Sequence, residues 1–306
     1  MDLSVVVPTL NGRERLDGCL DALREAVPDA EVVVVNGPST DGTAGVARDH
    51  PVVDHLLQIP ERNLNAARNA GIGATGGDVV AMVSHGSAVE ESWLTALRDA
   101  RDAGAEVVAG PVHRTVEGGV TTEAEERTSL FGREVTFFDG GNVAFTRAVV
   151  EALDGFDEYL EVGAARDAAH RLAGMGVEVR WTPEFSVLRT EGNDIPSRMA
   201  ADPGASVRGP KYRSLAYRLT KNYGLRWRTV ARPLRHAAVD AGVALRDVVR
   251  GDRPLASWAH TGLEVGHNLV SGTRDGLLAR RADPSSTRNP HGVSARVDRT
   301  VVRHEA

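Results

Sequence analysis

The sequence predicts an α/β fold, with a mostly parallel sheet covered by helices and a mainly helical C-terminal extension. Three observations carry this prediction. Apolar runs recur at residues 3–8, 30–37, 52–59 and 77–84, and segments with helical periodicity separate them. Each run is apolar almost throughout, as in parallel strands that are buried on both faces. In the last third of the chain, helix-like periods replace the strand runs.

The segments between the apolar runs have the spacing of amphipathic helices. In the first segment, Leu16, Leu20 and Leu23 fall on one helical face. By the same reasoning, helices are predicted at residues 12–28, 39–50, 63–75 and 90–104, with a fifth strand at 105–112. Residues 113–138 are polar and predict a hairpin or a mobile loop outside the sheet. A later helix ends at Gly176, and a short strand follows near residues 177–181.

The chain divides into two predicted parts, residues 1–194 and residues 195–306. The sheet domain is expected to end near residues 189–194, and a linker follows it. The extension reads as amphipathic helices, in which Pro233 allows a break. The polar tail after Ala282 is expected to be poorly ordered.

Composition points to a soluble globular protein. Of 306 residues, 42% are hydrophobic and 25% are charged, which is ordinary for this class. Cys19 is the single cysteine, so the chain can form no internal disulfide, and its helical spacing predicts a small core residue. No signal peptide and no run long enough to span a membrane are apparent. We therefore expect a cytoplasmic protein.

The net charge of −6 is spread unevenly along the chain. Residues 206–250 carry 11 Lys plus Arg against two acids, so an acidic body bears a basic segment. Aromatic residues interleave with this charge, a combination suited to lipid headgroups: Tyr212, Tyr217, Tyr223 and Trp227. The segment is predicted to contact a membrane surface or, alternatively, to pack as a solvated helical face on the main domain. Nucleic acid is a poor fit, because no known binding motif is present.

Polar residues that follow the strands mark the expected ligand site. Ligands of such sheets bind beyond the carboxyl ends of the strands. Residues 9–11, 36–41 and 84–87 stand there.

Six stretches follow one another along roughly the first six-tenths of the chain: SVVVPTLNGRERLDGCLDAL, VVVVNGPSTDGT, NLNAARNAGIGATGGDVVAMV, SWL, FDGGNVAFTRAVVEALDGFDE and RLAGMGVEVRWTPE. In this order they resemble the family 2 glycosyltransferases of the GT-A, Rossmann-like fold. The resemblance implies inverting transfer of a hexose from a nucleotide sugar. The stretches VVNGPSTDGT and KYRSLAYRLTKNYG also resemble haloarchaeal (archaeal) transferases that build glycans on dolichol phosphate for protein N-glycosylation. That subset implies a lipid-linked glycan acceptor, a hexuronic acid as the donor sugar, and a peripheral place at the cytoplasmic face of the membrane.

Three positions depart from the family pattern. Asn36 stands where a nucleoside-binding carboxylate is usual, and an amide can still donate and accept hydrogen bonds. Ser84 and Gly86 stand where the family has metal-binding aspartates. Ala164 and Ala165 replace the Glu-Asp pair that usually supplies the base, and Asp167 remains two residues later.

The chemistry of the reaction selects the candidate site residues. The loop at residues 84–87 offers one imidazole and two hydroxyls, a poor set for Mg²⁺ or Mn²⁺, so no metal ligand is predicted. Arg62, Arg68 and His85 are cationic substitutes that could stabilise the leaving diphosphate. Asp167, or otherwise Asp139, is the expected catalytic base. The predicted donor-binding residues are Pro8, Thr9, Asn11, Asn36, Arg68, His85, Gly141 and Asn142.

Two hypotheses follow. In the first, the chain is an active glycosyltransferase that acts on a lipid-linked acceptor with weak or no metal dependence. In the second, it is a non-catalytic GT-A module that scaffolds or regulates a partner transferase, because three acidic positions are lost in one site. Sugar transfer with and without EDTA, and calorimetry with nucleoside diphosphates, separate the two.

Overall fold

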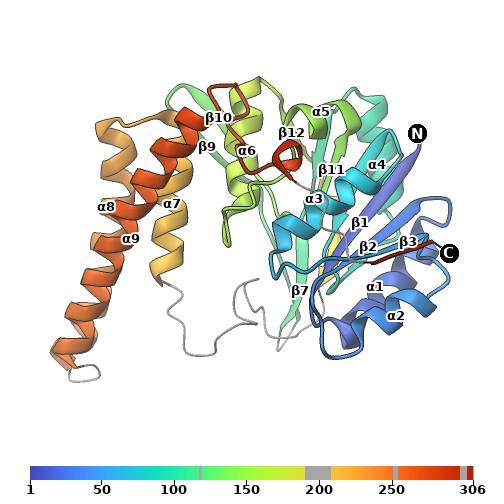
Figure 1. Cartoon of the computed structure of the whole chain (residues 1–306), viewed down its shortest axis with the longest axis horizontal. Coiled ribbons are helices and arrows are strands. Elements are labelled where there is room, and N and C mark those ends of the chain that lie inside the picture. The colour runs from blue at the N-terminus through green and yellow to red at the C-terminus, as the bar shows by residue number, and fades with distance from the viewer. Residues whose placement is uncertain (117–118, 190–207, 251–253, 297–301, 306) are drawn as a thin grey trace.

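The computed structural model describes residues 1–116, 119–189, 208–250, 254–296 and 302–305 (Figure 1). The first part of the chain alternates strands and helices: β1 (Leu3–Thr9), α1 (Arg13–Ala26), β2 (Glu31–Asn36), α2 (Thr43–Asp49), β3 (His55–Gln58), α3 (Leu64–Ala74), β4 (Val79–Val83), β5 (Ser87–Val89), α4 (Trp93–Asp102) and β6 (Val107–Ala109). This order confirms the predicted alternation.

The second part of the chain begins with antiparallel strands and ends in long helices. Its elements are β7 (Val112–Val116), β8 (Gly119–Thr122), β9 (Glu126–Leu130), β10 (Arg133–Phe137), β11 (Asn142–Thr146), α5 (Arg147–Ala152), α6 (Ala164–Met175), β12 (Val179–Trp181), β13 (Val187–Arg189), α7 (Arg208–Tyr223), α8 (Trp227–Arg250), α9 (Leu255–Ala282), a 3₁₀ turn (Val293–Ala295) and β14 (Val302–Glu305).

The central sheet has the strand order β12-β6-β11-β4-β1-β2-β3-β14. Strands β4, β1, β2 and β3 are mutually parallel, as are β12 and β6, whereas β11 and β14 run antiparallel to their neighbours. The sheet is therefore mostly parallel, as the apolar runs predict. Because β11 is antiparallel, its amino end lies at the same edge as the carboxyl end of β4, where Asn142 pairs with Val83.

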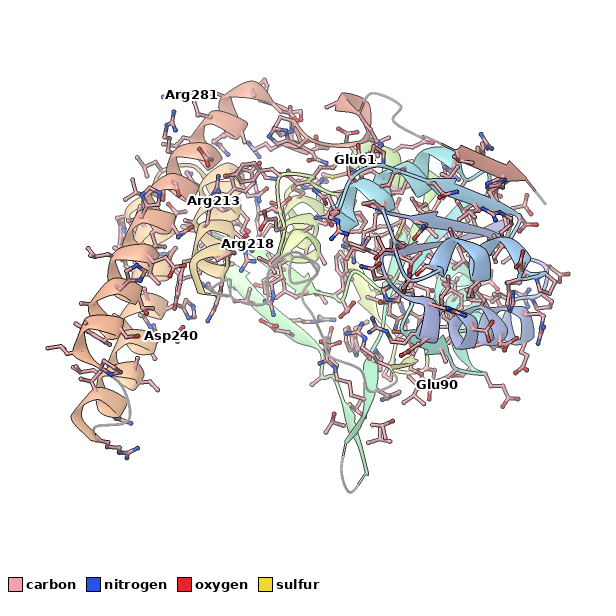
Figure 2. The ribbon with its side chains drawn as sticks, turned by 60° about the horizontal axis from the view of Figure 1, so that its bottom comes forward. Glu61, Glu90, Arg213, Arg218, Asp240 and Arg281 are labelled. Carbon is pink, nitrogen blue, oxygen red and sulfur yellow. The ribbon has the colours of Figure 1, made fainter. Side chains whose placement is uncertain are left out.

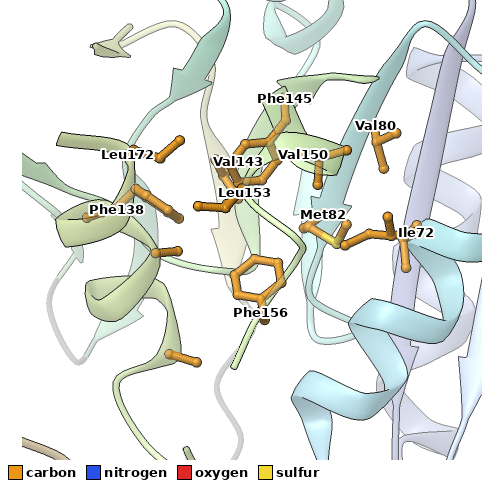
Figure 3. Close-up of a cluster of buried hydrophobic side chains, with 14 of the residues drawn as sticks. Ile72, Val80, Met82, Phe138, Val143, Phe145, Val150, Leu153, Phe156 and Leu172 are labelled. Atoms are coloured by element: carbon orange, nitrogen blue, oxygen red, sulfur yellow. The ribbon is translucent and has the colours of Figure 1, made fainter. Parts of the chain in front are cut away.

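Helices cover both faces of this sheet. Successive residues of β1 point to opposite faces, so Val6 joins one core cluster while Val5 and Val7 join the other. The first cluster packs beneath α3, α5 and α6 (Figure 3), and its labelled members are Ile72, Val80, Met82, Phe138, Val143, Phe145, Val150, Leu153, Phe156 and Leu172. The second cluster lies beneath α1 and α4. A sheet buried on both faces explains why its strands are almost wholly apolar.

The polar segment after residue 112 forms two hairpins. Strand β7 pairs with β8, and β9 pairs with β10. The β7–β8 hairpin stands away from the domain (Figure 2), while β10 packs on α6. The predicted excursion from the sheet is thus a pair of hairpins.

Helices α7, α8 and α9 form a separate layer beside the sheet domain (Figure 1). Helix α9 packs closely on α7, because Gly272 and Gly276 have no side chains: a Cβ at Gly272 would lie 2.3 Å from the carbonyl oxygen of Arg213. Helix α8 continues through Pro233, although the sequence suggests a break there. No helix in the described residues is both long and apolar enough to cross a bilayer.

The tail after Ala282 corrects one expectation. Residues 283–296 are held against the domain, while residues 297–301 and 306 of the predicted tail lie outside the described residues. The Asn289 side chain donates to the carbonyl oxygen of Asp154 at 2.6 Å, and Arg296 pairs with Glu158 at 3.2 Å. Strand β14 then extends the sheet beside β3. The predicted linker and the predicted domain boundary near residue 194 lie outside the described residues, so the division into two domains stays a prediction.

Candidate active site

The candidate site lies at the carboxyl edge of the parallel strands. Thr9 and Asn36 end β1 and β2 side by side, and Ser84 follows β4. The backbone N–H of Ser84 donates to the carbonyl oxygen of Gly141 at 3.0 Å, which joins the loop after β4 to the loop before β11. The sheet topology therefore gathers segments from residues 8–12, 36–41, 84–87 and 139–142 at one edge, as expected for ligand sites of such sheets.

The loops after β1 and β2 brace each other. The side-chain oxygen of Asn11 accepts from the N–H of Thr40 at 3.0 Å, and the hydroxyl of Ser39 donates to the side-chain oxygen of Asn36 at 2.6 Å. Asn11 has a left-handed backbone, which asparagine tolerates well. Asp41 accepts from the N–H of Thr43 and is thus a helix-start residue. Asn11 and Asn36 lie at the predicted edge. Asn11 links the loop after β1 to the loop after β2, and Asn36 binds Ser39 within the loop after β2.

His85 is neutral in this environment. Its Nδ1 lies 3.3 Å from the carbonyl oxygen of Pro8. Burial, together with the charge of Arg15, lowers the pKa of His85 to about 4. A neutral imidazole that donates from Nδ1 has a free acceptor at Nε2. Without a ligand, His85 therefore offers the site a hydrogen-bond acceptor rather than a positive charge, and its predicted place at the donor edge stays a prediction.

Buried polar atoms without partners mark the place beside His85. Nε2 of His85 and the hydroxyl of Thr9 have no hydrogen-bond partner among the described residues. A Cβ on Gly12 would lie 2.6 Å from that hydroxyl and 3.1 Å from Nε2, so a glycine keeps the space between them open. Buried polar groups are normally paired, so these two are suited to hydrogen bonds with a ligand.

Arg68 lies in the same region and retains bonding capacity. It is 9% exposed, its Nη1 donates to the side-chain oxygen of Asn65 at 2.8 Å, and its Nε has no partner among the described residues. Burial lowers the pKa of Arg68 to about 10, while the charge of Asp139 raises it. The guanidinium therefore stays charged at neutral pH. A Cβ on Gly140 would lie only 2.9 Å from Nη2, so that glycine admits the guanidinium.

Asp139 is the partly exposed carboxylate of the site. One oxygen accepts from the N–H of Gly141 at 2.7 Å, and the other lies 3.4 Å from Arg189. Its side chain is 24% exposed, so an acceptor could reach it. Gly141 lies against Ser84, since a Cβ there would be 2.7 Å from the Cβ of Ser84. These contacts hold a carboxylate beside two arginines, Arg68 and Arg189.

Asn142 has a different surrounding. It is fully buried, its side-chain oxygen accepts from the indole of Trp93 at 3.0 Å, and its amide donates to the carbonyl oxygen of Phe185 at 2.8 Å. Asn142 therefore ties β11 to α4 and to the segment before β13. This geometry does not support its prediction as a sugar ligand.

Asp167 is a buried counterion. Its carboxylate accepts from Lys221 at 2.7 Å, from Arg171 at 2.8 Å and from Asn222 at 2.8 Å. Burial alone would raise the pKa of Asp167, but the charges of Lys221 and Arg171 outweigh it and lower the pKa to about 2. A fully buried carboxylate with three donors is poorly placed to take a proton from an acceptor. The geometry favours Asp139 as the base.

The residues do not fit a divalent cation. The described residues contain no group of three His, Cys, Asp or Glu side chains arranged as a metal site. At the position where the family has carboxylates, the loop offers the Ser84 and Ser87 hydroxyls and one imidazole, and Mg²⁺ or Mn²⁺ needs several oxygen ligands. No step is therefore assigned to a metal.

Sequence reasoning missed three charged residues of this region. Arg15 follows β1 by six residues and acts on His85, Arg189 ends β13 beside Asp139, and Glu123 follows β8. Partial burial and the charge of Asp139 raise the pKa of Glu123. The position of Arg15 near the start of a helix after a strand was a usable signal. Arg189 and Glu123 reach the site only through the pairing of β13 with β7 and of β7 with β8. Arg62, in contrast, is exposed and contacts the carbonyl oxygen of Pro38.

Comparisons with known proteins bear on the family and the fold of the chain. Residues 4–153 match the model of Glycosyl transferase family 2. The chain is 30% identical over 137 residues to the glycosyltransferase AglE of Haloferax volcanii. The aligned residues are 42% of this chain and 44% of that protein. It is 32% identical over 171 residues to the polyprenol monophosphomannose synthase of Mycolicibacterium smegmatis. The aligned residues are 49% of this chain and 63% of that protein. The chain thus spans less than two thirds of these curated relatives.

A solved structure supports the fold. The mannosyltransferase PcManGT from Pyrobaculum calidifontis, in complex with GDP-Man and Mn²⁺, superposes with a TM-score of 0.55 at 17% identity, covering 90% of this chain and 86% of that one. At this identity the likeness concerns the fold alone. The strand order, the site at the carboxyl edge and the family match agree with one another. Residues 4–153 therefore match glycosyl transferase family 2, and the chain has the GT-A fold.

Proposed function

We propose that this chain is an active glycosyltransferase that moves a sugar from a nucleotide-sugar donor to a lipid-linked glycan, with inversion. The observation that carries the proposal is the grouping of Asp139 with Arg68 and Arg189 at the carboxyl edge of the sheet. A carboxylate beside two arginines supplies a base and the charge that a leaving diphosphate needs. The match of residues 4–153 to the family supports the reaction class.

In the proposed reaction, an acceptor hydroxyl attacks the anomeric carbon of the donor sugar while the bond from that carbon to the diphosphate breaks. The carboxylate of Asp139 takes the proton of the hydroxyl, and the nucleoside diphosphate leaves. Arg68 and Arg189 stabilise the negative charge that develops on the leaving group, since guanidinium groups match phosphate oxygens well. Thr9, through its hydroxyl, and His85, through Nε2, bind the donor as neutral hydrogen-bonding groups.

The finer assignment follows from the resemblance of the sequence to haloarchaeal transferases. We propose a dolichol-phosphate-linked acceptor within protein N-glycosylation and a hexuronic acid as the donor sugar. The likeness to the polyprenol monophosphomannose synthase of Mycolicibacterium smegmatis, whose name includes a polyprenol, supports a lipid-linked acceptor. Arg15, Arg68 and Arg189 lie near the site, and their positive charge also suits an additional carboxylate on the donor sugar. The same proposal places the protein at the cytoplasmic face of the cell membrane.

The test is an assay of wild-type protein with a panel of nucleotide sugars, including nucleotide hexuronic acids, and dolichol-phosphate-linked acceptors. Asp139→Asn keeps the shape of the side chain and removes the base, so kcat should fall about 10²–10⁴-fold. Asp99→Asn, on the far helix α4, is the matched control and should leave kcat unchanged. No transfer by folded wild-type protein, or full activity of Asp139→Asn, would contradict the proposal.

The non-catalytic alternative has one specific observation in its favour. Ala165 stands at the position of the family's usual base, and its Cβ lies beside Gly140 within the site. Calorimetry with nucleoside diphosphates separates the hypotheses. Tight binding that depends on the sugar of the nucleotide supports the enzyme, whereas no binding supports the scaffold.

A further inference from the structure

Helices α8 and α9 expose large apolar side chains. On α8 the exposed ones include Trp227 (75% exposed) and Leu234 (52%), and on α9 they include Leu263 (77%) and Val270 (71%). Trp227, Val230, Leu234 and Leu245 recur at intervals of three, four and eleven residues, which places them on one helical face. Soluble proteins rarely leave contiguous apolar surface of this kind without a partner.

Helices α8 and α9 form an apolar groove between them. The groove, here called the α8–α9 groove, has a volume of about 690 Å³. Its lining residues are Ala216, Val230, Pro233, Leu234, Leu269, Val270, Thr273, Arg274, Leu277, Leu278 and Arg281. These described residues include two arginines and no carboxylate. An apolar floor is thus combined with positive charge.

More arginines adjoin the apolar face of α8. At roughly 100° per residue, Arg228, Arg235 and Arg246 fall on the side of the helix next to Trp227 and Leu234. The guanidinium of Arg228 lies 5.3 Å from the centre of the Trp227 ring. Arg281 marks one end of α9 in Figure 2, on the far side of the helical layer from the sheet domain. The apolar face is therefore bordered by cations along α8 and α9.

The tyrosines of the basic segment do not belong to this surface. Tyr212, Tyr217 and Tyr223 are at most 6% exposed. The hydroxyl of Tyr217 donates to Asp157 at 2.8 Å, within the contact between α7 and the sheet domain. This corrects the expectation that all four aromatic residues of the segment face lipid headgroups. Trp227 alone of the four is exposed.

We propose that the α8–α9 groove and the arginines around it are a docking surface for an anionic lipid bilayer, with both helices lying in the plane of the headgroups. A bilayer presents negative charge above an apolar interior, which complements a face of this composition. A second copy of the chain would bring like charges together across the groove, which disfavours self-association. The biological reason for docking rests on the proposed lipid-linked acceptor, whereas the binding of the groove to a bilayer can be tested without any sugar.

The docking surface is joined to the sheet domain, which carries the candidate active site. Arg280, next to Arg281, donates to the carbonyl oxygens of Lys221 at 2.9 Å and of Asn222 at 3.1 Å, at the end of α7. Lys221 in turn binds Asp157 and Asp167 of the sheet domain. A helical layer fixed in this way would hold the active site at a set distance from the membrane that presents the acceptor.

Flotation with vesicles of phosphatidylcholine, with and without about 30% phosphatidylglycerol, tests the proposal, since anionic lipid adds attraction for each arginine. Wild-type full-length protein should float with the anionic vesicles and much less with the neutral ones. Leu234→Asp with Val270→Asp should weaken binding at least tenfold. Arg274→Gln with Arg281→Gln should weaken it about tenfold and reduce its salt dependence. Val120→Asp, at an exposed apolar position of β8, is the matched control and should bind as wild type does.

Several outcomes would overturn the proposal. One is wild-type protein that does not bind anionic vesicles at low salt. Another is a Leu234→Asp/Val270→Asp variant, folded by circular dichroism, that binds as wild type does. A solution dimer that this variant converts to monomer would instead make the groove an interface between copies. Sugar transfer to a short, water-soluble acceptor is measured on the same variants and should be unchanged. If the wild-type protein binds vesicles but transfers no sugar, that result counts against the proposed function alone.

Discussion

At the carboxyl edge of the sheet, the Thr9 hydroxyl, Nε2 of His85 and Nε of Arg68 are buried without hydrogen-bond partners among the described residues. Between α6 and α7, by contrast, the buried Lys221 has two charged partners: it binds Asp157 at 2.6 Å and Asp167 at 2.7 Å. Arg171 also pairs with Asp167, so the charges of Asp157, Asp167, Lys221 and Arg171 balance. Satisfied groups stabilise the fold, whereas unsatisfied ones are available to a ligand.

His170 and His85 show the same difference. His170, at 2% exposed, has Nδ1 2.9 Å from the hydroxyl of Tyr223. Burial, with the charge of Arg218, lowers the pKa of His170 to about 3. His85 is neutral as well, but its Nε2 has no described partner. Substitutions should therefore affect stability in the region between α6 and α7, and catalysis at the sheet edge.

Lys221→Met should have the largest effect on stability. It removes a cation that is fully buried between two carboxylates, and breaking such a pair costs about 3–5 kcal/mol. Urea unfolding measures the loss. Lys211→Met is the control, because Lys211 pairs with Asp240 at the surface with 58% of its side chain exposed, and the cost there should stay below about 1 kcal/mol. Equal losses in both variants would erase the contrast between the two regions.

Arg68→Met should show the opposite profile. It removes charge stabilisation of the leaving group, so kcat should fall about 10²–10³-fold. The free energy of unfolding should change by less than about 1 kcal/mol, because replacing an incompletely paired buried charge with an apolar side chain is often neutral. Steady-state kinetics and urea unfolding of the same preparation give both values. Arg24→Met, at the surface of α1, controls for loss of an arginine. A stability loss as large as that of Lys221→Met would assign Arg68 to the fold instead.

Acid should destabilise the protein through its neutral histidines. In the unfolded chain a histidine takes up its proton near pH 6.5, while the folded state keeps His170 neutral to about pH 3 and His85 neutral to about pH 4. The unfolded state therefore binds more protons in this window, and stability falls as pH decreases, by up to about 1.4 kcal/mol per pH unit for each histidine. Urea unfolding between pH 7 and about pH 4.5 measures the slope.

His170→Asn should reduce the histidine part of that slope by about half, because His85 then contributes without His170. Asp167 contributes in a lower window: its stabilisation is present above about pH 4 and is lost as pH falls toward 2, since its folded pKa is lowered to about 2. An unchanged slope in His170→Asn would show that the folded state already protonates His170.

Removal of divalent cations should have the smallest effect. If arginines and neutral donors carry the diphosphate, EDTA should change the transfer rate by less than about twofold. Activity that EDTA abolishes and Mn²⁺ restores would mean that hydroxyls and an imidazole bind a metal despite the poor donor set.

The sheet domain could be predicted well from the sequence, because its strands are buried on both faces and must be apolar. Val6 and Val34 lie in strands that the apolar runs identify, and the helices between them follow from leucine spacing. The edge that gathers Thr9, Asn36 and Ser84 also follows from parallel topology. The buried Cys19, whose pKa burial raises to about 12, fits its predicted place in the core.

The roles of the site residues depended on contacts far apart in the chain. Asp167 and Asn142 looked like catalytic and sugar-binding residues from their motifs. The partners that turn them inward are Lys221, 54 residues after Asp167, and Trp93, 49 residues before Asn142. Arg189 reaches Asp139 across 50 residues because β13 joins a sheet edge.

The sequence by itself determined the α/β alternation, the place of the ligand edge and the loss of the usual carboxylates, because these depend on local spacing and residue type. Only the tertiary structure decided which charges are satisfied: Asp167 by Lys221, Asp139 in part by Arg189, and His85 neutral through burial. It also decided that the tyrosines of the basic segment face inward while α8 and α9 turn an apolar, arginine-bordered face outward. Ionisation and exposure are properties of the packed chain, since both depend on neighbours that sequence distance does not reveal.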